Sequence, residues 1–378
     1  MYAVGIQNEP SFGQSYGSCV YDPVSMAAVI GVTGKRFEDN KISTKIIFPE
    51  DMGEVSINNQ FVITLNNNAL AKKYGHIFGV HQYNQDGVTP GSIASSTWSS
   101  LYKIAQRGAT RPIWMTETSG FGAGVPAMEK MYTTIYSALK FGNISAWNWY
   151  DATDNDSDVE HASAFFVKKD GKQIFTKKGQ AFRHYSKHIR PGAIMVEANC
   201  AADADILPLA FQDNFRNRLT IILINNDSVN SKTILLNFTD ANSPKKFGGY
   251  RTSDKIDYQV MDSISASSSI TLPPNCITTL VGNNSKPIIS ATENVESINR
   301  KYQLTVYPNP SKDGFYIRGN AAYSDIIEIK LLDLQGKELK TILYANDGND
   351  SYINTENLRN GVYMLKYNNR FEKIVINK

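Results

Sequence analysis

The sequence opens on Tyr2-Ala3-Val4-Gly5-Ile6-Gln7-Asn8-Glu9-Pro10, a short apolar run that ends abruptly in Asn-Glu-Pro. The apolar residues predict a buried strand, and Pro10 ends it because proline has no backbone N–H to donate. A glutamate is rarely buried unless it is paired or functional. Glu9, at the end of a buried strand, is therefore a candidate functional carboxylate.

A second stretch of the same kind is Ile113-Trp114-Met115-Thr116-Glu117-Thr118, in which Glu117 also follows a run that predicts a strand. In a barrel of parallel strands, residues at the carboxyl ends of different strands surround one site. Two glutamates far apart in the sequence can therefore face each other there. The sequence predicts that Glu9 and Glu117 form a functional pair; the alternative is that both are ordinary surface carboxylates.

Residues 1–185 alternate short apolar segments with segments of helical period. Strands are expected at residues 2–7, 44–48, 77–81, 113–116 and 144–149. Helices are expected at residues 23–37, about 66–74, 95–107 and 127–141. This alternation predicts an α/β domain whose parallel sheet is connected by crossover helices. Polar residues end each strand, as in a (β/α)8 barrel, although only five strands are expected and a closed barrel needs eight.

From about residue 190 onward, strands follow one another without helices between them. Turn sequences such as Asn225-Asn226-Asp227 separate these strands, which predicts an antiparallel side β-sandwich. A polar, aperiodic segment then predicts a linker before a second all-β unit. The expected fold class is α/β plus all-β, with domains at residues 1–185, 186–284 and 302–378 and the linker at 285–301.

The composition excludes several classes of protein. Of the 378 residues, 42% are hydrophobic, and the formal net charge is only +3, so the chain is not of the disordered class and no nucleic-acid partner is expected. No apolar run is long enough for a membrane span. The five histidines and three cysteines show no metal-ligand spacing, so neither a metal nor a cofactor is expected. Cys200 and Cys276 are either a disulfide pair or structural thiols.

Further motifs occur in order along residues 1–284. They are Asn8-Glu9-Pro10 with Ser15-Tyr16-Gly17-Ser18-Cys19, Lys45-Ile46-Ile47-Phe48-Pro49-Glu50, His81-Gln82-Tyr83, Trp114-Met115-Thr116-Glu117 and Ser186-Lys187-His188-Ile189-Arg190-Pro191-Gly192. Together they resemble glycoside hydrolase family 30, and residues 272–281 resemble the end of that family's side β-sandwich. The resemblance implies a partial (β/α)8 TIM barrel that holds strands 4–8 only, in an N-terminally truncated chain. The alternative is a divergent, smaller fold.

The resemblance also implies a retaining β-glycosidase, whose double displacement needs two carboxyl groups roughly 5–5.5 Å apart. Glu9 would be the general acid/base and Glu117 the nucleophile. Asn8 would bind the sugar 2-hydroxyl, a contact that strengthens in the transition state. The expected substrate is a β-linked polysaccharide, such as xylan or a β-1,6-linked polymer.

Four more residues are predicted to bind substrate or to support the pair. Tyr83 would donate its hydroxyl to Glu117 and keep that carboxylate ionised, and His81, two residues earlier on an extended segment, would point the same way. Trp149 would stack on a sugar ring, and Glu50 would bind a sugar hydroxyl. The alternatives are a packed His–Tyr pair, core packing of Trp149 and pairing of Glu50 with a cation at the barrel rim.

The last unit contains Tyr307-Pro308-Asn309-Pro310, Asp333-Leu334-Gln335-Gly336-Lys337 and Asn360-Gly361-Val362-Tyr363. These motifs resemble the C-terminal sorting domain of the type IX secretion system, an Ig-like β-sandwich. The resemblance implies that residues 302–378 engage the type IX secretion machinery and that the protein is secreted or displayed on a bacterial cell surface. No signal peptide is visible at the N-terminus, which agrees with the expected truncation.

The segment at residues 151–160 is rich in acidic side chains and contains no arginine. It is either a solvated loop, a calcium site or a loop that excludes some substrates. Family members specific for xylan decorated with glucuronic acid use basic residues near this place, so the acidic segment argues against that specificity. Two further functions stay open: an inactive fragment, and a carbohydrate-binding surface protein whose sandwich binds the glycan.

Overall fold

The computed structural model describes residues 1–52, 54–81, 95–150, 152–154, 165–169, 171–285, 304–319, 325–346, 350–367 and 370–378. Tyr83, most of the acidic segment and all but the first residue of the expected linker lie outside these ranges. None of the helices in the described ranges is long and apolar enough to cross a membrane. Cys19, Cys200 and Cys276 are all free, which confirms the alternative of unpaired thiols.

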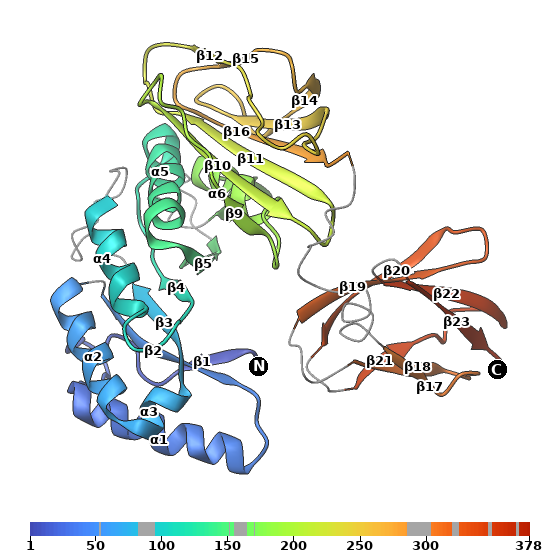
Figure 1. Cartoon of the computed structure of the whole chain (residues 1–378), viewed down its shortest axis with the longest axis horizontal. Coiled ribbons are helices and arrows are strands. Elements are labelled where there is room, and N and C mark those ends of the chain that lie inside the picture. Colours follow the sequence, from blue (N-terminus) through green and yellow to red (C-terminus); the bar gives the residue numbers. More distant parts are fainter. Residues whose placement is uncertain are drawn as a thin grey trace.

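The N-terminal region is built on a five-stranded sheet in which every neighbouring pair of strands is parallel (Figure 1). The strands lie in sequence order: β1 (Ala3–Gly5), β2 (Lys45–Met52), β3 (Gly75–His81), β4 (Ile113–Glu117) and β5 (Ile144–Trp147). The five expected strands and their parallel direction are confirmed. Because all strands run the same way, their carboxyl ends meet along one edge of the sheet.

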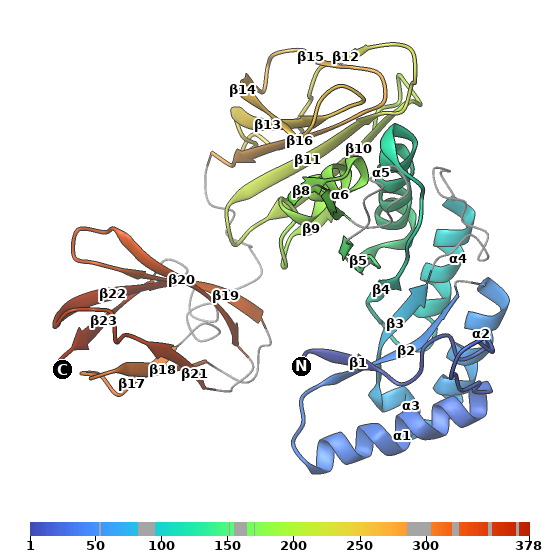
Figure 2. The ribbon, with the colours of Figure 1, turned by 180° about the vertical axis from the view of Figure 1, so that it is seen from behind.

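Helices connect these strands and cover one face of the sheet (Figures 1 and 2). They are α1 (Pro23–Asp39), α2 (Val55–Asn67), α3 (Ala69–Tyr74), α4 (Ser95–Ala105) and α5 (Gly124–Gly142). Asp22 caps α1, because its carboxylate accepts hydrogen bonds from the backbone N–H groups of Val24 and Ser25 at 2.8 and 3.0 Å. Pro23 suits the first helical position because its φ is fixed near the helical value.

The core of this region lies between the helices and the sheet. Phe48, Phe78 and Met115 of the strands belong to one buried cluster with Trp98 of α4, and all four side chains are almost completely buried. Burying a side chain of this size contributes about 1.5–3 kcal/mol to the free energy of unfolding. The other face of the sheet carries Glu50, and the polar residues of the site lie at its edge.

One expected helix was placed wrongly. The segment predicted as a helix over about residues 66–74 belongs to two helices, α2 and α3, which are separated at Asn68. Asn68 has an extended backbone (φ −104°, ψ 113°), and its side chain accepts a hydrogen bond from the N–H of Ala71 at 3.0 Å. Asparagine competes with helical hydrogen bonds in this way, so it ends one helix and caps the next.

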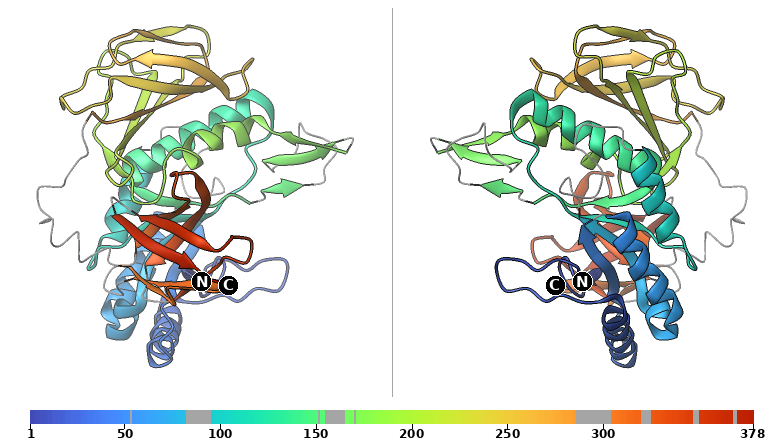
Figure 3. Two further views of the ribbon diagram at one scale, coloured as in Figure 1. Left: turned by 90° about the vertical axis from the view of Figure 1, so that its right-hand side faces the viewer. Right: turned by 90° about the vertical axis from the view of Figure 1, so that its left-hand side faces the viewer.

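Two elements after β5 were not expected from the sequence. A small three-stranded sheet consists of β6 (Thr153–Asp154), β7 (Phe166–Lys169) and β8 (Lys172–Phe175). Helix α6 (Lys177–Ser186) follows, and its N-terminus is capped by the hydroxyl of Thr176. Figure 3 shows α5 and α6 side by side below the sandwich. The hydroxyl of Tyr185 on α6 donates to the carbonyl of Tyr132 on α5 at 2.8 Å.

The side β-sandwich is confirmed. Its six-stranded sheet has the order β14-β13-β16-β11-β10-β9, and a two-stranded sheet, β12-β15, covers one of its faces. The other face packs on α5 and α6 through apolar residues such as Leu209 and Ile222. The strands are β9 (Ile194–Val196), β10 (Ile206–Asp213), β11 (Arg218–Asn225), β12 (Lys232–Ile234), β13 (Lys246–Thr252), β14 (Gln259–Ser265), β15 (Ile270–Leu272) and β16 (Cys276–Asn283).

The C-terminal unit is a second sandwich with its own core. Sheets β17-β18-β21 and β20-β19-β22-β23 are antiparallel, and Phe315, Ile329 and Leu365 are buried between them. The strands are β17 (Thr305–Tyr307), β18 (Gly314–Arg318), β19 (Asp325–Leu332), β20 (Glu338–Asn346), β21 (Ser351–Asn354), β22 (Gly361–Tyr367) and β23 (Arg370–Ile376). The expected all-β character of this unit is confirmed.

Candidate active site

Four predicted site residues lie along the carboxyl edge of the parallel sheet. Glu9 follows β1, Glu50 lies in β2, and His81 and Glu117 end β3 and β4. Glu9 and Glu50 have left-handed backbone angles, with φ of 45° and 60°. Non-glycine residues seldom adopt such angles, and they concentrate at functional sites. The N–H of Glu9 donates to the carbonyl of Glu50 at 3.0 Å, so the two turns support each other.

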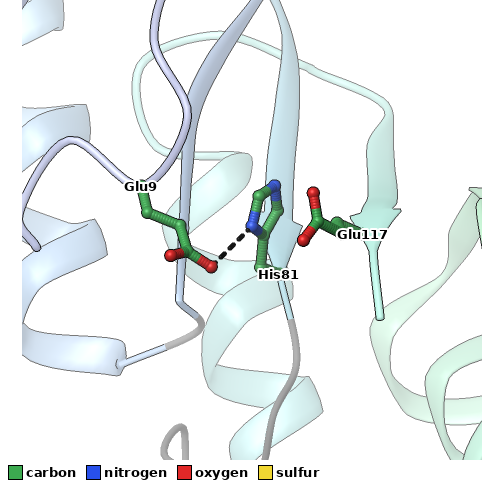
Figure 4. Close-up of side chains that lie close together, drawn as sticks. All are labelled: Glu9, His81 and Glu117. Carbon is green, nitrogen blue, oxygen red and sulfur yellow. Dashed lines mark hydrogen bonds and ion pairs between the residues drawn. The ribbon is translucent and has the colours of Figure 1, made fainter. Parts of the chain in front are cut away.

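The side chains of Glu9, His81 and Glu117 converge (Figure 4). One polar atom from each of the three residues lies within 4.8 Å of the other two. Nδ1 of His81 is 3.0 Å from Oε1 of Glu9, and Nε2 of Gln14 donates to the other oxygen of Glu9. Glu9 and His81 are 5% and 2% exposed, whereas Glu117 is half-buried. The structure therefore brings the two predicted glutamates together on either side of one imidazole.

His81 lies between the two glutamates. It was expected to point with Tyr83 toward Glu117, and one of its ring nitrogens lies within 4.8 Å of a carboxylate oxygen of Glu117. Its Nδ1 makes a hydrogen bond with Glu9, which was not expected. The register of the β3–β4 pair shifts between Val80 and His81, so His81 lies opposite Glu117 in the ladder while its ring reaches toward Glu9. The predicted contact of Tyr83 with Glu117 falls outside the described residues.

Glu50 lies on the face of the sheet that the helices leave uncovered. Burial raises the pKa of Glu50, the negative charge of Glu117 adds to the rise, and His81 and the hydroxyl of Thr116 oppose it. Glycines on the neighbouring strands make room for this side chain. A Cβ at Gly5 would overlap Oε2 of Glu50, and one at Gly79 would lie 3.0 Å from its Cγ. The absence of a side chain at Gly5 and Gly79 therefore leaves the space that the Glu50 side chain occupies.

Asp51 is a buried carboxyl that sequence reasoning missed. It is 0% exposed, and its Oδ1 accepts from the N–H of Met52 at 2.8 Å. Burial raises the pKa of Asp51, and the charge of Glu9 adds to the rise. Its only sequence signal is its place directly after Glu50 in a strand that is otherwise apolar. The edge thus holds more carboxyl groups than the predicted pair.

Asn8 and Trp149 are not in the converging cluster. The side chain of Asn8 is exposed. The indole of Trp149 stacks on Phe165, with ring centroids 5.4 Å apart and planes 19° apart, and meets Phe121 edge-on at 5.0 Å. These contacts agree with the packing alternative. Binding of sugar by Asn8 or Trp149 stays a prediction.

Lys178 is a second buried residue that the sequence did not reveal. It is 1% exposed, and its ammonium donates to the carbonyls of Gly120 and Gly122 at 3.0 and 2.7 Å. It also lies 5.7 Å from the ring centroid of Trp149. Burial lowers the pKa of Lys178 to about 8. The loop that contains Gly120 and Gly122 begins directly after Glu117. The hydrogen bonds of Lys178 therefore connect α6 to the loop that follows Glu117.

Comparison with known proteins matches both parts of the chain. A family model described as "Secretion system C-terminal sorting domain" matches residues 305–377. The glucuronoxylanase XynC of Bacillus subtilis (strain 168) is 24% identical over 294 residues, which is 75% of this chain and 61% of that protein. The chain thus spans about three-fifths of the length of this curated relative.

Solved structures agree with this match. A GH30 endoxylanase from Clostridium papyrosolvens C71 superposes with a TM-score of 0.60 at 21% identity, covering 75% of this chain and 66% of that one. The endo-beta1,6-glucanase BT3312 superposes with a TM-score of 0.56 at 19% identity, covering 75% and 59%. The fold is that of a TIM-barrel-like region with an additional β domain. The chain therefore joins a region that is similar to a glucuronoxylanase and to GH30 xylanase structures with a segment, residues 305–377, that matches the secretion system C-terminal sorting domain.

Proposed function

We propose that this chain is a retaining β-glycosidase that cleaves a β-linked polysaccharide such as xylan. The observation that carries the proposal is the approach of Glu9 and Glu117, whose polar atoms lie within 4.8 Å of each other. Retaining glycosidases hold their two carboxyl groups roughly 5–5.5 Å apart, whereas inverting enzymes leave about 6.5–9.5 Å for a water molecule. The short separation favours double displacement.

Glu9 is the general acid/base in this proposal. It protonates the glycosidic oxygen as the bond breaks, and then accepts a proton from the water that attacks the intermediate. Its burial, and its hydrogen bonds with His81 and Gln14, fix the carboxyl group in one orientation. A fixed orientation supports proton transfer, because the acid must lie within hydrogen-bond reach of the leaving oxygen.

Glu117 is the nucleophile. It is more exposed than Glu9, as a group that must contact the anomeric carbon needs to be. Its attack forms a covalent glycosyl-enzyme with loss of the protonated leaving group, and water then releases the sugar with the original anomeric configuration. Glu50 lies close enough to Glu117 to be affected by its charge, and it can offer a hydrogen bond to a sugar hydroxyl.

The relatives favour a β-glycan as substrate, since they include a glucuronoxylanase, an endoxylanase and an endo-beta1,6-glucanase. The acidic segment 151–160 favours an undecorated chain over one with glucuronic acid side groups. We also assign strands β1–β5 to strands four to eight of a (β/α)8 barrel, supported by their parallel, sequential order. The sorting domain supports export through the type IX secretion machinery to the cell surface or medium.

Reducing-sugar release from a polysaccharide panel tests the activity. The panel contains glucuronoxylan, xylan without acidic side groups, a β-1,6-glucan and a β-1,4-glucan, each incubated with the unmodified chain and with Glu117→Gln. We expect release by the unmodified chain alone, with the product's anomeric configuration retained by proton NMR. Release from none of the four, or equal release by Glu117→Gln, would contradict the proposal, and binding without release would favour a carbohydrate-binding protein.

Export is tested separately. A fusion of the chain behind a signal peptide is expressed in a bacterium that has the type IX system. We expect the full chain in the surface and medium fractions, and a version without residues 302–378 in the periplasm. Equal delivery of both versions would overturn the assigned role of the sorting domain.

A further inference from the structure

The carboxyl edge of the sheet carries an excess of negative groups. Glu9, Glu50, Asp51 and Glu117 all lie there, and His81 is the basic group whose charge acts on Glu50. The carboxyls of Glu9 and Asp51 are buried, where charge is poorly screened by water. A buried group of carboxylates of this kind favours any cation that can reach it.

Three of these residues are arranged as ligands of a metal ion. Glu9, His81 and Glu117 come from three different strand ends, and each offers one ligand atom within 4.8 Å of the other two. The 3.0 Å between Nδ1 of His81 and Oε1 of Glu9 is close to the roughly 3.3 Å between two ligands of a tetrahedral ion with bonds of about 2.0–2.1 Å. The carboxylate of Glu117 is the third ligand of the set, within 4.8 Å of the other two.

The surroundings hold one of these ligands, Glu9, in place. Gln14 donates to the oxygen of Glu9 that does not face His81. The backbone of Glu9 is fixed by the hydrogen bond from its N–H to the carbonyl of Glu50. Hydrogen bonds of this kind orient ligands and raise the affinity of metal sites by about 10–100-fold.

The donor set selects the type of ion. An imidazole with two carboxylates suits Zn²⁺, which is bound in many proteins by three side chains and a water molecule. Mg²⁺ and Ca²⁺ prefer oxygen ligands throughout and gain little from an imidazole. We propose that Glu9, His81 and Glu117 bind one Zn²⁺ ion, which takes the place of the reacting sugar and reversibly blocks the site.

Zn²⁺ binding is measured by calorimetry on the full chain. The reference chain and all variants carry Cys19→Ser, because an exposed free thiol such as Cys19 is a competing zinc ligand. We expect one ion per chain, with affinity reduced at least about 10-fold in His81→Gln and in Glu117→Gln. Glu197→Gln, the same change at an exposed carboxylate outside the cluster, leaves the affinity unchanged. Mg²⁺ at the same concentration does not bind.

Thermal melting separates loss of ligand from loss of folding. Zn²⁺ raises the Tm of the reference chain and of Glu197→Gln, because a ligand that binds only the folded state stabilises it. The rise in Tm is smaller in folded His81→Gln and Glu117→Gln, because these variants bind the ion more weakly. The proposal would be overturned if the reference chain, Glu197→Gln, His81→Gln and Glu117→Gln all bound zinc equally and showed equal Tm shifts. It would also be overturned if the reference chain bound no zinc.

The inhibition rests on the proposed glycosidase function, whereas the binding does not. With an active chain, Zn²⁺ raises the apparent KM without lowering kcat, and a chelator restores the rate. Noncompetitive inhibition would place the ion elsewhere. If the chain hydrolyses no polysaccharide but binds zinc through these three residues, the proposed glycosidase function is contradicted and the proposed zinc site is supported.

Discussion

The Nδ1 atom of His81 lies 3.0 Å from the Oε1 atom of Glu9, so a hydrogen bond connects the end of β3 to the turn after β1. A carboxylate oxygen of Glu117 lies within 4.8 Å of both residues. The hydrogen bond ties the proposed acid/base to a buried imidazole on the strand between the two glutamates. The arrangement gives Glu9 and Glu117 different surroundings, which is what two carboxyl groups with different roles require.

Glu9→Gln is expected to lower kcat on a polysaccharide by about 10²–10⁴-fold, because the glycosidic oxygen is no longer protonated. An aryl glycoside with a good leaving group does not need that proton, so its bond-cleavage step should be nearly unaffected. Steady-state and burst kinetics with both substrates measure the difference. Glu197→Gln is the matched control, and equal losses on both substrates would contradict the role of Glu9.

Gly5→Ala tests the packing of Glu50 against β1. A Cβ at this position overlaps Oε2 of Glu50, so the glutamate must move or the strand must shift, at a cost of about 1–3 kcal/mol. We expect a lower Tm and a raised KM. Gly17→Ala is the control, since no atom lies within 4 Å of its added Cβ. Unchanged KM and Tm in Gly5→Ala would show that Glu50 is placed differently.

Lys178→Met keeps the length of the side chain but removes the hydrogen bonds to Gly120 and Gly122. The loop after Glu117 then loses its anchor on α6, and we expect kcat to fall more than KM rises. Denaturant unfolding and steady-state kinetics measure the change against Lys168→Met, an exposed lysine. A variant with wild-type kcat would show that the loop is held by its other contacts alone.

The sandwich is expected to lose stability in acid because of His188. Burial, together with the positive charges of Lys187, Arg218 and Arg183, lowers the pKa of His188 to about 4 from its ordinary 6.5. Between these pH values the unfolded chain binds a proton that the folded chain does not, so the contribution of His188 is complete above pH 6.5 and is lost as the pH falls toward 4.

The loss amounts to about 3 kcal/mol at its limit. Urea unfolding at several pH values measures the slope, and His188→Gln should flatten it. The pKa of the buried His184 also lies well below its ordinary value, so His184 contributes in the same direction. The free energy of unfolding of His188→Gln should therefore still rise with pH, although less steeply. A slope that His188→Gln does not change would contradict the account.

Much of the site could be predicted because it lies at strand ends. Short apolar runs that stop in Asn8-Glu9, Glu50, His81 and Glu117 indicate parallel strands, and parallel strands bring their carboxyl ends to one edge. The hydrogen bond between His81 and Glu9 could not be predicted in this way. It depends on a register shift in the β3–β4 ladder and on the left-handed turn at Glu9, and neither leaves a periodic pattern.

Other residues left too weak a signal in the sequence. Lys178 meets a loop more than 50 residues earlier in the chain, and a buried lysine looks like any exposed one in a helical segment. Strand β14 (Gln259–Ser265) is largely exposed and polar, so its alternation is too weak to indicate a strand. The burial of Lys178 depends on contacts with residues far away in the sequence, and the formation of β14 depends on its pairing with β13.

Trapping the glycosyl-enzyme tests the central claim most directly. A 2-deoxy-2-fluoro-β-xylobioside with an activated leaving group slows the release step, so that a retaining enzyme accumulates the covalent intermediate. Mass spectrometry of the peptides from the labelled chain then locates the sugar. The proposed function predicts one fluorosugar per chain, attached to Glu117 and absent from Glu117→Gln. A label on any other residue, or turnover with inversion and no label, would contradict it.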